Sequence, residues 1–116
     1  MSSSIVQTQI KIIKSGFARP VGYPKAQIKK VGVIGAGLMG HGISLVSSFN
    51  GIEVILLDKT EELAKYGLSK INGILKNKID RKVIYPNVRE QILRLIYATN
   101  DFSLLKDCDL IIEAVY

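Results

Sequence analysis

The chain has 116 residues, of which 47% are hydrophobic and 22% are charged, so it is long enough for one modest globular domain. The first 30 residues carry the whole formal net charge of +6, with six basic residues and no acidic one, whereas residues 31–116 hold ten of each sign. This distribution argues against a nucleic-acid-binding surface, which needs basic residues clustered on structured elements. The single cysteine, Cys108, excludes an intrachain disulfide.

Residues 1–27 are predicted to be a basic leader or linker outside the main domain. Their first part contains serine and basic residues without acidic ones, which loosely matches an organelle transit peptide. A plain linker or an additional strand are the alternatives that the pattern favours. The stretch from residue 31 to 52 has no charge, but its six glycines and three serines exclude a membrane span.

Residues 28–34 predict a first strand, and a glycine-rich turn follows it directly. Gly35, Gly37 and Gly40 stand in G-x-G-x-x-G spacing before a predicted helix over residues 38–49, which ends at Asn50-Gly51. Gly35 allows a tight turn, Gly37 lets the backbone approach a pyrophosphate, and Gly40 lets the helix pack closely on the strand. The positive end of the helix dipole then faces the phosphate charge.

A second predicted strand over residues 53–57 ends in Asp58, about 20 residues after the first glycine. Its carboxylate can accept hydrogen bonds from the adenosine ribose hydroxyls, and it would repel a 2′-phosphate, so NAD is favoured over NADP. Lys59 weakens that preference. Strand, glycines, helix, second strand and terminal acid together predict a dinucleotide-binding βαβ unit, with a generic FAD or NADP enzyme as a weaker alternative.

A long amphipathic helix is predicted to follow, from the N-cap Thr60 to about residue 80. Its apolar stripe recurs at steps of three and four and comprises Leu63, Gly67, Ile71, Ile74, Leu75 and Ile79. Pro86 interrupts the chain before another short helix over residues 88–95.

Two more strands are predicted, over residues 95–99 and 110–115, joined by a brief helical connection over residues 102–106. The whole pattern indicates an α/β fold: a partial, Rossmann-type doubly wound parallel sheet with strand order 3-2-1-4 and a helical insertion between strands two and three. The domain would be the N-terminal part of an NAD-binding Rossmann domain, over residues 28–116.

Two segments carry a resemblance to a known family. Residues 29–43, with Val-Ile-Gly-Ala-Gly-Leu-Met-Gly-His-Gly, resemble the opening of the NAD-binding domain of 3-hydroxyacyl-CoA dehydrogenases. Residues 107–115, which end in Glu-Ala-Val, resemble the fourth-strand motif of that family. Residues 18–25 look like the linker before this domain in the alpha subunits of fatty-acid oxidation complexes. The long helical insertion is also similar.

This resemblance implies a set of cofactor contacts and a reaction. The implied NAD-binding residues are Gly35, Gly37, Leu38, Met39 and Gly40 in the phosphate loop, Asp58 and Lys59 at the ribose, and Glu113, Ala114, Val115 and Tyr116 along the crevice. In the family a hydride passes from a 3-hydroxyacyl-CoA to NAD while a histidine takes the hydroxyl proton.

The family's catalytic His–Glu pair, its substrate-binding Ser and Asn, and its helical second domain are expected beyond residue 116. We therefore expect no catalytic residue and no dehydrogenase activity in this chain alone, and an acyl-CoA partner only in a full-length enzyme. A stand-alone NAD-binding regulatory module is the alternative. The expected compartment is the cytoplasm, or the mitochondrial matrix in a eukaryote.

Expectations also follow for the only histidine, for a cluster of basic residues and for the last predicted strand. His41, the only histidine, lies in the first turn of the first helix, where a packing role is favoured over catalysis. A basic cluster of Lys76, Lys78, Arg81 and Lys82 is predicted to be a solvated face, with a CoA phosphate contact as the alternative from the resemblance. Strand 110–115 would lie at a sheet edge, so we expect self-association as a dimer through this edge or through the long helix.

Overall fold

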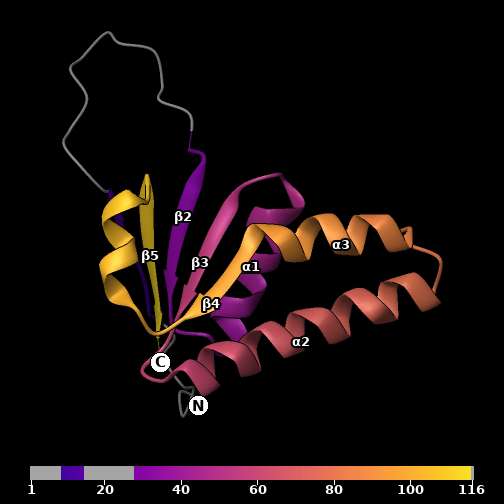
Figure 1. Ribbon diagram of the computed structural model, residues 1–116, viewed down its shortest axis with the longest axis horizontal. Helices are drawn as coiled ribbons and strands as arrows, with labels where there is room; N and C mark the ends of the chain where they lie inside the picture. Colours follow the sequence, from indigo (N-terminus) through magenta and orange to yellow (C-terminus); the bar gives the residue numbers. More distant parts are fainter. Residues whose placement is uncertain (1–8, 15–27, 116) are drawn as a thin grey trace, which may run out of the picture.

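The computed structural model describes residues 9–14 and 28–115. Five strands form one sheet in the order β1-β5-β2-β3-β4, as Figure 1 shows. The four parallel strands are β2 (Lys30–Ile34), β3 (Glu53–Leu57), β4 (Ile96–Thr99) and β5 (Leu110–Val115). Numbered by themselves along the chain, these four strands have the order 3-2-1-4, so the predicted parallel sheet is confirmed.

The strand β1 (Gln9–Lys14) pairs with β5 in antiparallel orientation, with Gln9 opposite Val115 and Lys14 opposite Leu110. These six residues therefore form an additional strand, which was one of the alternatives for the predicted leader. The rest of the predicted leader, including the linker resemblance at residues 18–25, lies outside the described residues.

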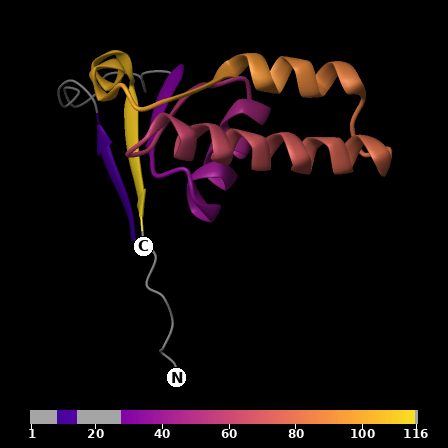
Figure 2. The ribbon, with the colours of Figure 1, turned by 60° about the horizontal axis from the view of Figure 1, so that its bottom comes forward.

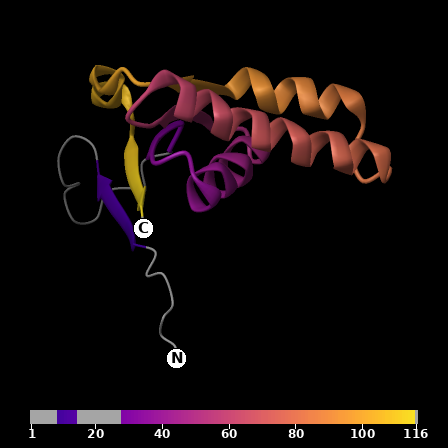
Figure 3. The ribbon, with the colours of Figure 1, turned by 90° about the horizontal axis from the view of Figure 1, so that it is seen from below.

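The pairing with β1 also corrects the prediction that β5 lies at a sheet edge (Figure 3). Both sides of β5 are hydrogen-bonded, to β1 and to β2. Its backbone groups are therefore not open to a second copy of the chain, and the edge-based argument for a dimer fails. Self-association through the long helix stays a prediction.

Three helices cover one face of the sheet: α1 (Leu38–Phe49), α2 (Glu61–Asp80) and α3 (Pro86–Leu95). The bounds of α1 agree with the prediction. The N-cap of α2 is also confirmed, because the Thr60 hydroxyl accepts a hydrogen bond from the Leu63 N–H at 3.1 Å. Helix α3 begins at Pro86 instead of residue 88, since the first helical position needs no N–H donor.

The buried face of α2 differs from the predicted stripe. Its buried residues are Ala64, Gly67, Ile71 and Leu75, whereas Leu63 is 47% exposed. Residues three or four apart lie on the same face of a helix. The buried residues, which start at Ala64, therefore face the core, and the neighbouring row that contains Leu63 and Ile74 lies beside that face. Helices α2 and α3 run side by side and extend beyond the sheet, as Figures 1 and 2 show.

The core lies on both faces of the parallel strands. On the helical face, Val33 and Leu56 of the sheet pack with Ile71 and Leu75 of α2 in one cluster, all fully buried. On the other face, Ile55, Leu57 and Cys108 pack with residues of a 3-10 helix, η1 (Phe102–Asp107). Burial on both sides explains the unbroken apolar run of β3.

Cys108 belongs to this second cluster and is only 3% exposed. Burial raises the pKa of its thiol, and the neighbouring carboxylates of Asp107 and Asp109 act in the same direction, while Lys30 opposes them. The thiol form is therefore favoured, which makes Cys108 a poor nucleophile.

Candidate cofactor site

Three neighbouring strands end together at one edge of the sheet. Ile34 of β2 lies opposite Leu57 of β3 and opposite Glu113 of β5. The chain continues from β2 toward β3 on one side and returns on the other side as β5, so the strand order reverses between β2 and β5. In doubly wound sheets, ligands bind in the crevice at the carboxyl ends of the strands beside such a point.

The turn after β2 is held in a tight conformation by its glycines. Gly35 has a φ of 104°, which favours glycine, and its N–H donates to the Leu57 carbonyl at 2.7 Å. A Cβ on Gly40 would overlap the carbonyl oxygen of Gly35. A Cβ on Gly67 of α2 would lie 2.6 Å from the Ala36 carbonyl oxygen, so α2 also packs directly against the turn.

The first turn of α1 presents backbone donors at this edge. The N-cap residue Gly37 contributes no side-chain hydrogen bond, and the Gly37 carbonyl accepts from the His41 N–H at 2.9 Å. The N–H groups of Leu38, Met39 and Gly40 precede that first helical bond, so they have no acceptor within the helix. Together with the helix dipole, such donors favour an anion.

Asp58 follows β3 and is tied to the glycine turn. Its Oδ2 accepts from the Ala36 N–H at 2.9 Å, and its Oδ1 accepts from the Lys59 N–H at 2.7 Å. These bonds fix the orientation of the carboxylate beside the turn. Each oxygen keeps a second lone pair, so Asp58 can still accept hydrogen bonds from the hydroxyls of a ligand.

A hollow of about 600 Å³ lies between the start of α1 and the helix α2. Four α2 residues that the sequence analysis did not assign to a site line it, at steps of three, four and four: Leu63, Tyr66, Lys70 and Ile74. The Lys70 ammonium lies 4.9 Å from the centroid of the Tyr66 ring. This helical spacing was the signal that could have identified them as one face.

His41 also lines this hollow and is 9% exposed. Among the described residues, no group forms a hydrogen bond with its buried Nδ1. Its burial agrees with the packing role predicted for it.

The end of β5 completes this edge. Glu113 is half-buried, Ala114 is 5% exposed, and Val115 is the last residue of the strand. Tyr116 lies outside the described residues. The structure thus brings the predicted residues of the glycine turn, the Asp58-Lys59 pair and the end of β5 to the same edge of the sheet.

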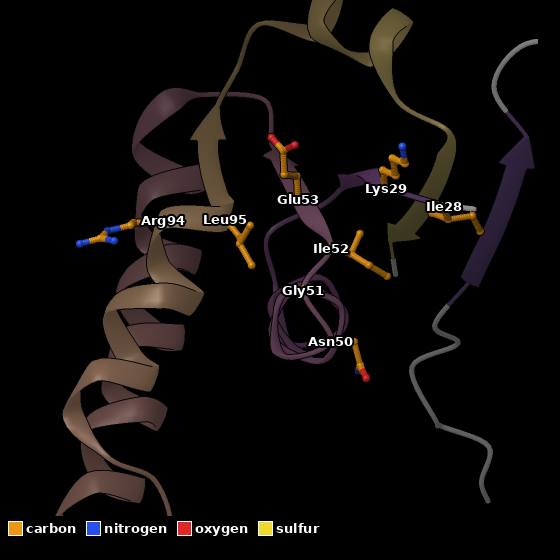
Figure 4. A pocket seen from close by; sticks show the side chains of 8 residues that line it. All are labelled: Ile28, Lys29, Asn50, Gly51, Ile52, Glu53, Arg94 and Leu95. Atoms are coloured by element: carbon orange, nitrogen blue, oxygen red, sulfur yellow. The ribbon is translucent and has the colours of Figure 1, made fainter. Parts of the chain in front are cut away.

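A second hollow, also about 600 Å³, lies at the opposite edge, where the strands begin. Figure 4 shows that its polar side chains diverge, with Arg94 and Lys29 pointing to opposite sides and Asn50 pointing away from both. They do not converge on a common ligand position. Within the described part of the chain, no group of His, Cys, Asp and Glu could hold a metal ion, and no helix is long and apolar enough to cross a membrane.

Several known proteins resemble this chain in sequence and in fold. The family described as 3-hydroxyacyl-CoA dehydrogenase, NAD binding domain, matches residues 30–116. A 3-hydroxybutyryl-CoA dehydrogenase of Bradyrhizobium diazoefficiens is 43% identical over 76% of this chain and 30% of its own length. A fatty acid oxidation complex subunit alpha of Colwellia psychrerythraea is 31% identical over 76% of this chain and 12% of its own.

Solved structures agree with this match. The (S)-3-hydroxybutyryl-CoA dehydrogenase of Ralstonia eutropha superposes with a TM-score of 0.70 at 25% identity, over 72% of this chain and 29% of that one. The 3-hydroxybutyryl-CoA dehydrogenase of Escherichia coli has a TM-score of 0.69 at 26% identity, over 72% and 18%.

The chain spans less than a third of the length of the curated relatives described above. The match covers the whole parallel part of the sheet and the edge that holds the glycine turn and Asp58. NAD is the cofactor that this kind of domain holds. The chain belongs to the family of 3-hydroxyacyl-CoA dehydrogenase NAD-binding domains.

Proposed function

We propose that this chain is the NAD-binding part of an enzyme that oxidises 3-hydroxyacyl-CoA to 3-oxoacyl-CoA. One observation carries the proposal: the glycine turn, the fixed Asp58 carboxylate and the ends of three parallel strands meet at one edge. When bound there, NAD supplies the acceptor for a hydride. The residues of this chain bind and orient it.

Each part of the edge has a proposed role in holding NAD. The N–H groups of Leu38, Met39 and Gly40 would bind the pyrophosphate, since they are free donors at a helix N-terminus. Asp58 would accept from the adenosine ribose, with Lys59 beside it. Ala114, Val115 and Tyr116 would line the adenine and nicotinamide-ribose side, with Glu113 next to them.

The hollow between α1 and α2 is lined by Asp58, Ala36 and Gly37 as well as by α2, so it is our candidate for the adenosine end of NAD. Its wall is mainly apolar, with Leu38, Leu63 and Ile74, and it also carries the Lys70 ammonium. An apolar wall with a few polar groups is typical of ligand sites, and here the polar group beside the glycine turn is the Asp58 carboxylate.

We expect these 116 residues to bind NAD without turning over substrate. A general base has to reach the proton that it removes. His41 is the only histidine, and it is held in the first turn of α1 with 9% of its surface exposed. The alternative, a regulatory NAD-binding module, shares this expectation, because it also binds without catalysis.

The test is a titration of the purified chain with NAD, followed by an assay for NADH with 3-hydroxybutyryl-CoA as substrate. The expected result is saturable NAD binding with no NADH formed above a protein-free control. Binding of neither NAD nor NADP would contradict the proposed cofactor role. Steady NADH formation would contradict the expected inactivity.

A further inference from the structure

The turn between α2 and α3 lies at the far end of the helical pair, away from the sheet (Figures 1 and 2). It contains the basic cluster that the cofactor site does not use: Lys76, Lys78, Arg81 and Lys82. We call residues 76–86, from the last basic turn of α2 to the start of α3, the hairpin tip.

Charge is distributed unevenly between this tip and the rest of the domain. Residues 76–82 hold four basic residues and one acidic residue, whereas the remainder of residues 31–116 holds six basic and nine acidic residues. Lys76, Arg81 and Lys82 are exposed. The salt bridges between described residues, Lys65–Glu61 and Arg94–Glu90, leave the tip cations unpaired.

The tip also exposes apolar side chains next to these cations. Tyr85 is 78% exposed and Val83 is 62% exposed, both well above the usual exposure of large apolar residues. They border a shallow hollow of about 450 Å³ whose wall is otherwise apolar apart from Lys82. An aromatic residue and an aliphatic residue surrounded by cations therefore project at the end of the helical pair.

The turn is closed by two backbone hydrogen bonds and holds one cation at a position that favours glycine. The Val83 N–H donates to the Lys78 carbonyl at 2.8 Å, and the Lys82 N–H donates to the Ile79 carbonyl at 2.9 Å, which is the Schellman pattern. Lys82 adopts a φ of 60° there, a conformation that disfavours side chains other than glycine. The position thus keeps a lysine at a cost in stability.

We propose that the hairpin tip docks on the surface of an anionic lipid bilayer. Cations beside the headgroups and a few apolar side chains at the interface are the features that such binding needs. A protein interface needs about 800 Å² on each side and is depleted of lysine at its centre, whereas this tip is a single turn rich in cations. A small anion would need converging donors, whereas the hollow at the tip has a single cation in its wall.

Co-sedimentation of the full chain with lipid vesicles tests this docking. We expect binding to vesicles of phosphatidylcholine with phosphatidylserine, little binding to phosphatidylcholine alone, and weakening as salt rises. The variant Arg81→Glu/Lys82→Glu should bind about tenfold more weakly or worse, since each cation near the surface contributes to the attraction. The matched control Arg94→Glu/Lys106→Glu has the same net charge and should change binding much less.

Two single substitutions distinguish an effect on vesicle binding from an effect on folding stability. Lys82→Gly removes one cation but relieves the left-handed backbone, so it should raise the unfolding midpoint while weakening vesicle binding about fivefold. Tyr85→Ser keeps every charge and should weaken binding to the same vesicles. All tip variants should keep the NAD affinity of the unaltered chain, so failure of docking is distinguishable from failure of the proposed function.

Several outcomes would overturn the proposal. One is no binding of the unaltered chain to anionic vesicles. Another is an equal loss of vesicle binding in Arg81→Glu/Lys82→Glu and in the control Arg94→Glu/Lys106→Glu. That result would mean that binding depends only on the net charge of the chain. A loss caused by Lys11→Glu/Lys14→Glu but not by the tip variant would assign the binding to β1 instead. Binding to polyglutamate without binding to vesicles would indicate an acidic protein partner.

Discussion

Replacing Gly40 with alanine should lower the free energy of unfolding by about 3 kcal/mol or more. The new Cβ would overlap the carbonyl oxygen of Gly35 and lie 2.7 Å from its carbonyl carbon. Both are backbone atoms of a turn that is held to β3 by the Gly35–Leu57 hydrogen bond. Relief would require α1 to move away from the sheet. Urea denaturation followed by circular dichroism measures the change.

Gly42→Ala is the matched control, because Gly42 lies in the same helix and a Cβ there would meet no atom within 4 Å. Alanine is the better helix former, so this variant should gain stability, by up to about 1 kcal/mol. If both variants lost stability equally, or if Gly40→Ala cost nothing, the close packing of α1 on the glycine turn would be wrong.

Replacing Asp58 with asparagine should weaken NAD binding about 10- to 100-fold, as expected for losing a charged acceptor of ligand hydrogen bonds. Asparagine has one acceptor oxygen, whereas Asp58 uses both carboxylate oxygens to hold the N–H groups of Ala36 and Lys59. The variant also removes the negative charge that opposes a 2′-phosphate, so the preference for NAD over NADP should fall. Calorimetric titration with each dinucleotide measures both effects.

Asp109→Ala provides the control for structural damage. The Oδ2 of Asp109 accepts from the N–H groups of Lys29 and Lys30 at 2.8 and 3.0 Å, at the opposite edge of the sheet. This variant disturbs a comparable pair of backbone bonds but should leave NAD affinity unchanged. Equal loss of affinity in both variants would show that Asp58 acts through stability alone.

The parts of the fold that local sequence determines were predicted well. The glycine spacing, the Asn50-Gly51 stop and the Thr60 cap are signals within a few residues of the helix ends that they set, and α1 and α2 lie where these signals indicate. The four parallel strands are short apolar runs between those helices. Their order follows from the right-handed connection rule and the resemblance.

The pairing of the additional strand shows what local pattern does not determine. Strand β1 pairs with β5, so Gln9 meets a residue more than 100 positions away in the sequence. The basic, acid-free composition around β1 left a leader, a linker and a strand open, and nothing near it in the sequence marks β5 as its partner. The prediction that β5 is an edge failed for the same reason.

The candidate site was predicted only in part, because some of its residues directly follow strands whereas others lie on one face of the helix α2. The glycine turn and Asp58 follow strands directly, so their place at the carboxyl edge could be inferred. The apolar residues of α2 recur in overlapping rows, and the sequence alone did not show that Leu63 and Ile74 face the hollow while Ile71 and Leu75 face the core. The unpaired Nδ1 of His41 depends on packing around it.

Amide chemical shifts recorded by NMR during a titration with NAD test the central claim most directly. We predict that the largest shifts occur at residues 36–40 and at Lys59, where backbone N–H groups adjoin the proposed phosphate and ribose positions. Residues 50–53, at the opposite edge in Figure 4, should not move. Saturable shifts confined to that opposite edge, or none at the glycine turn, would contradict the account.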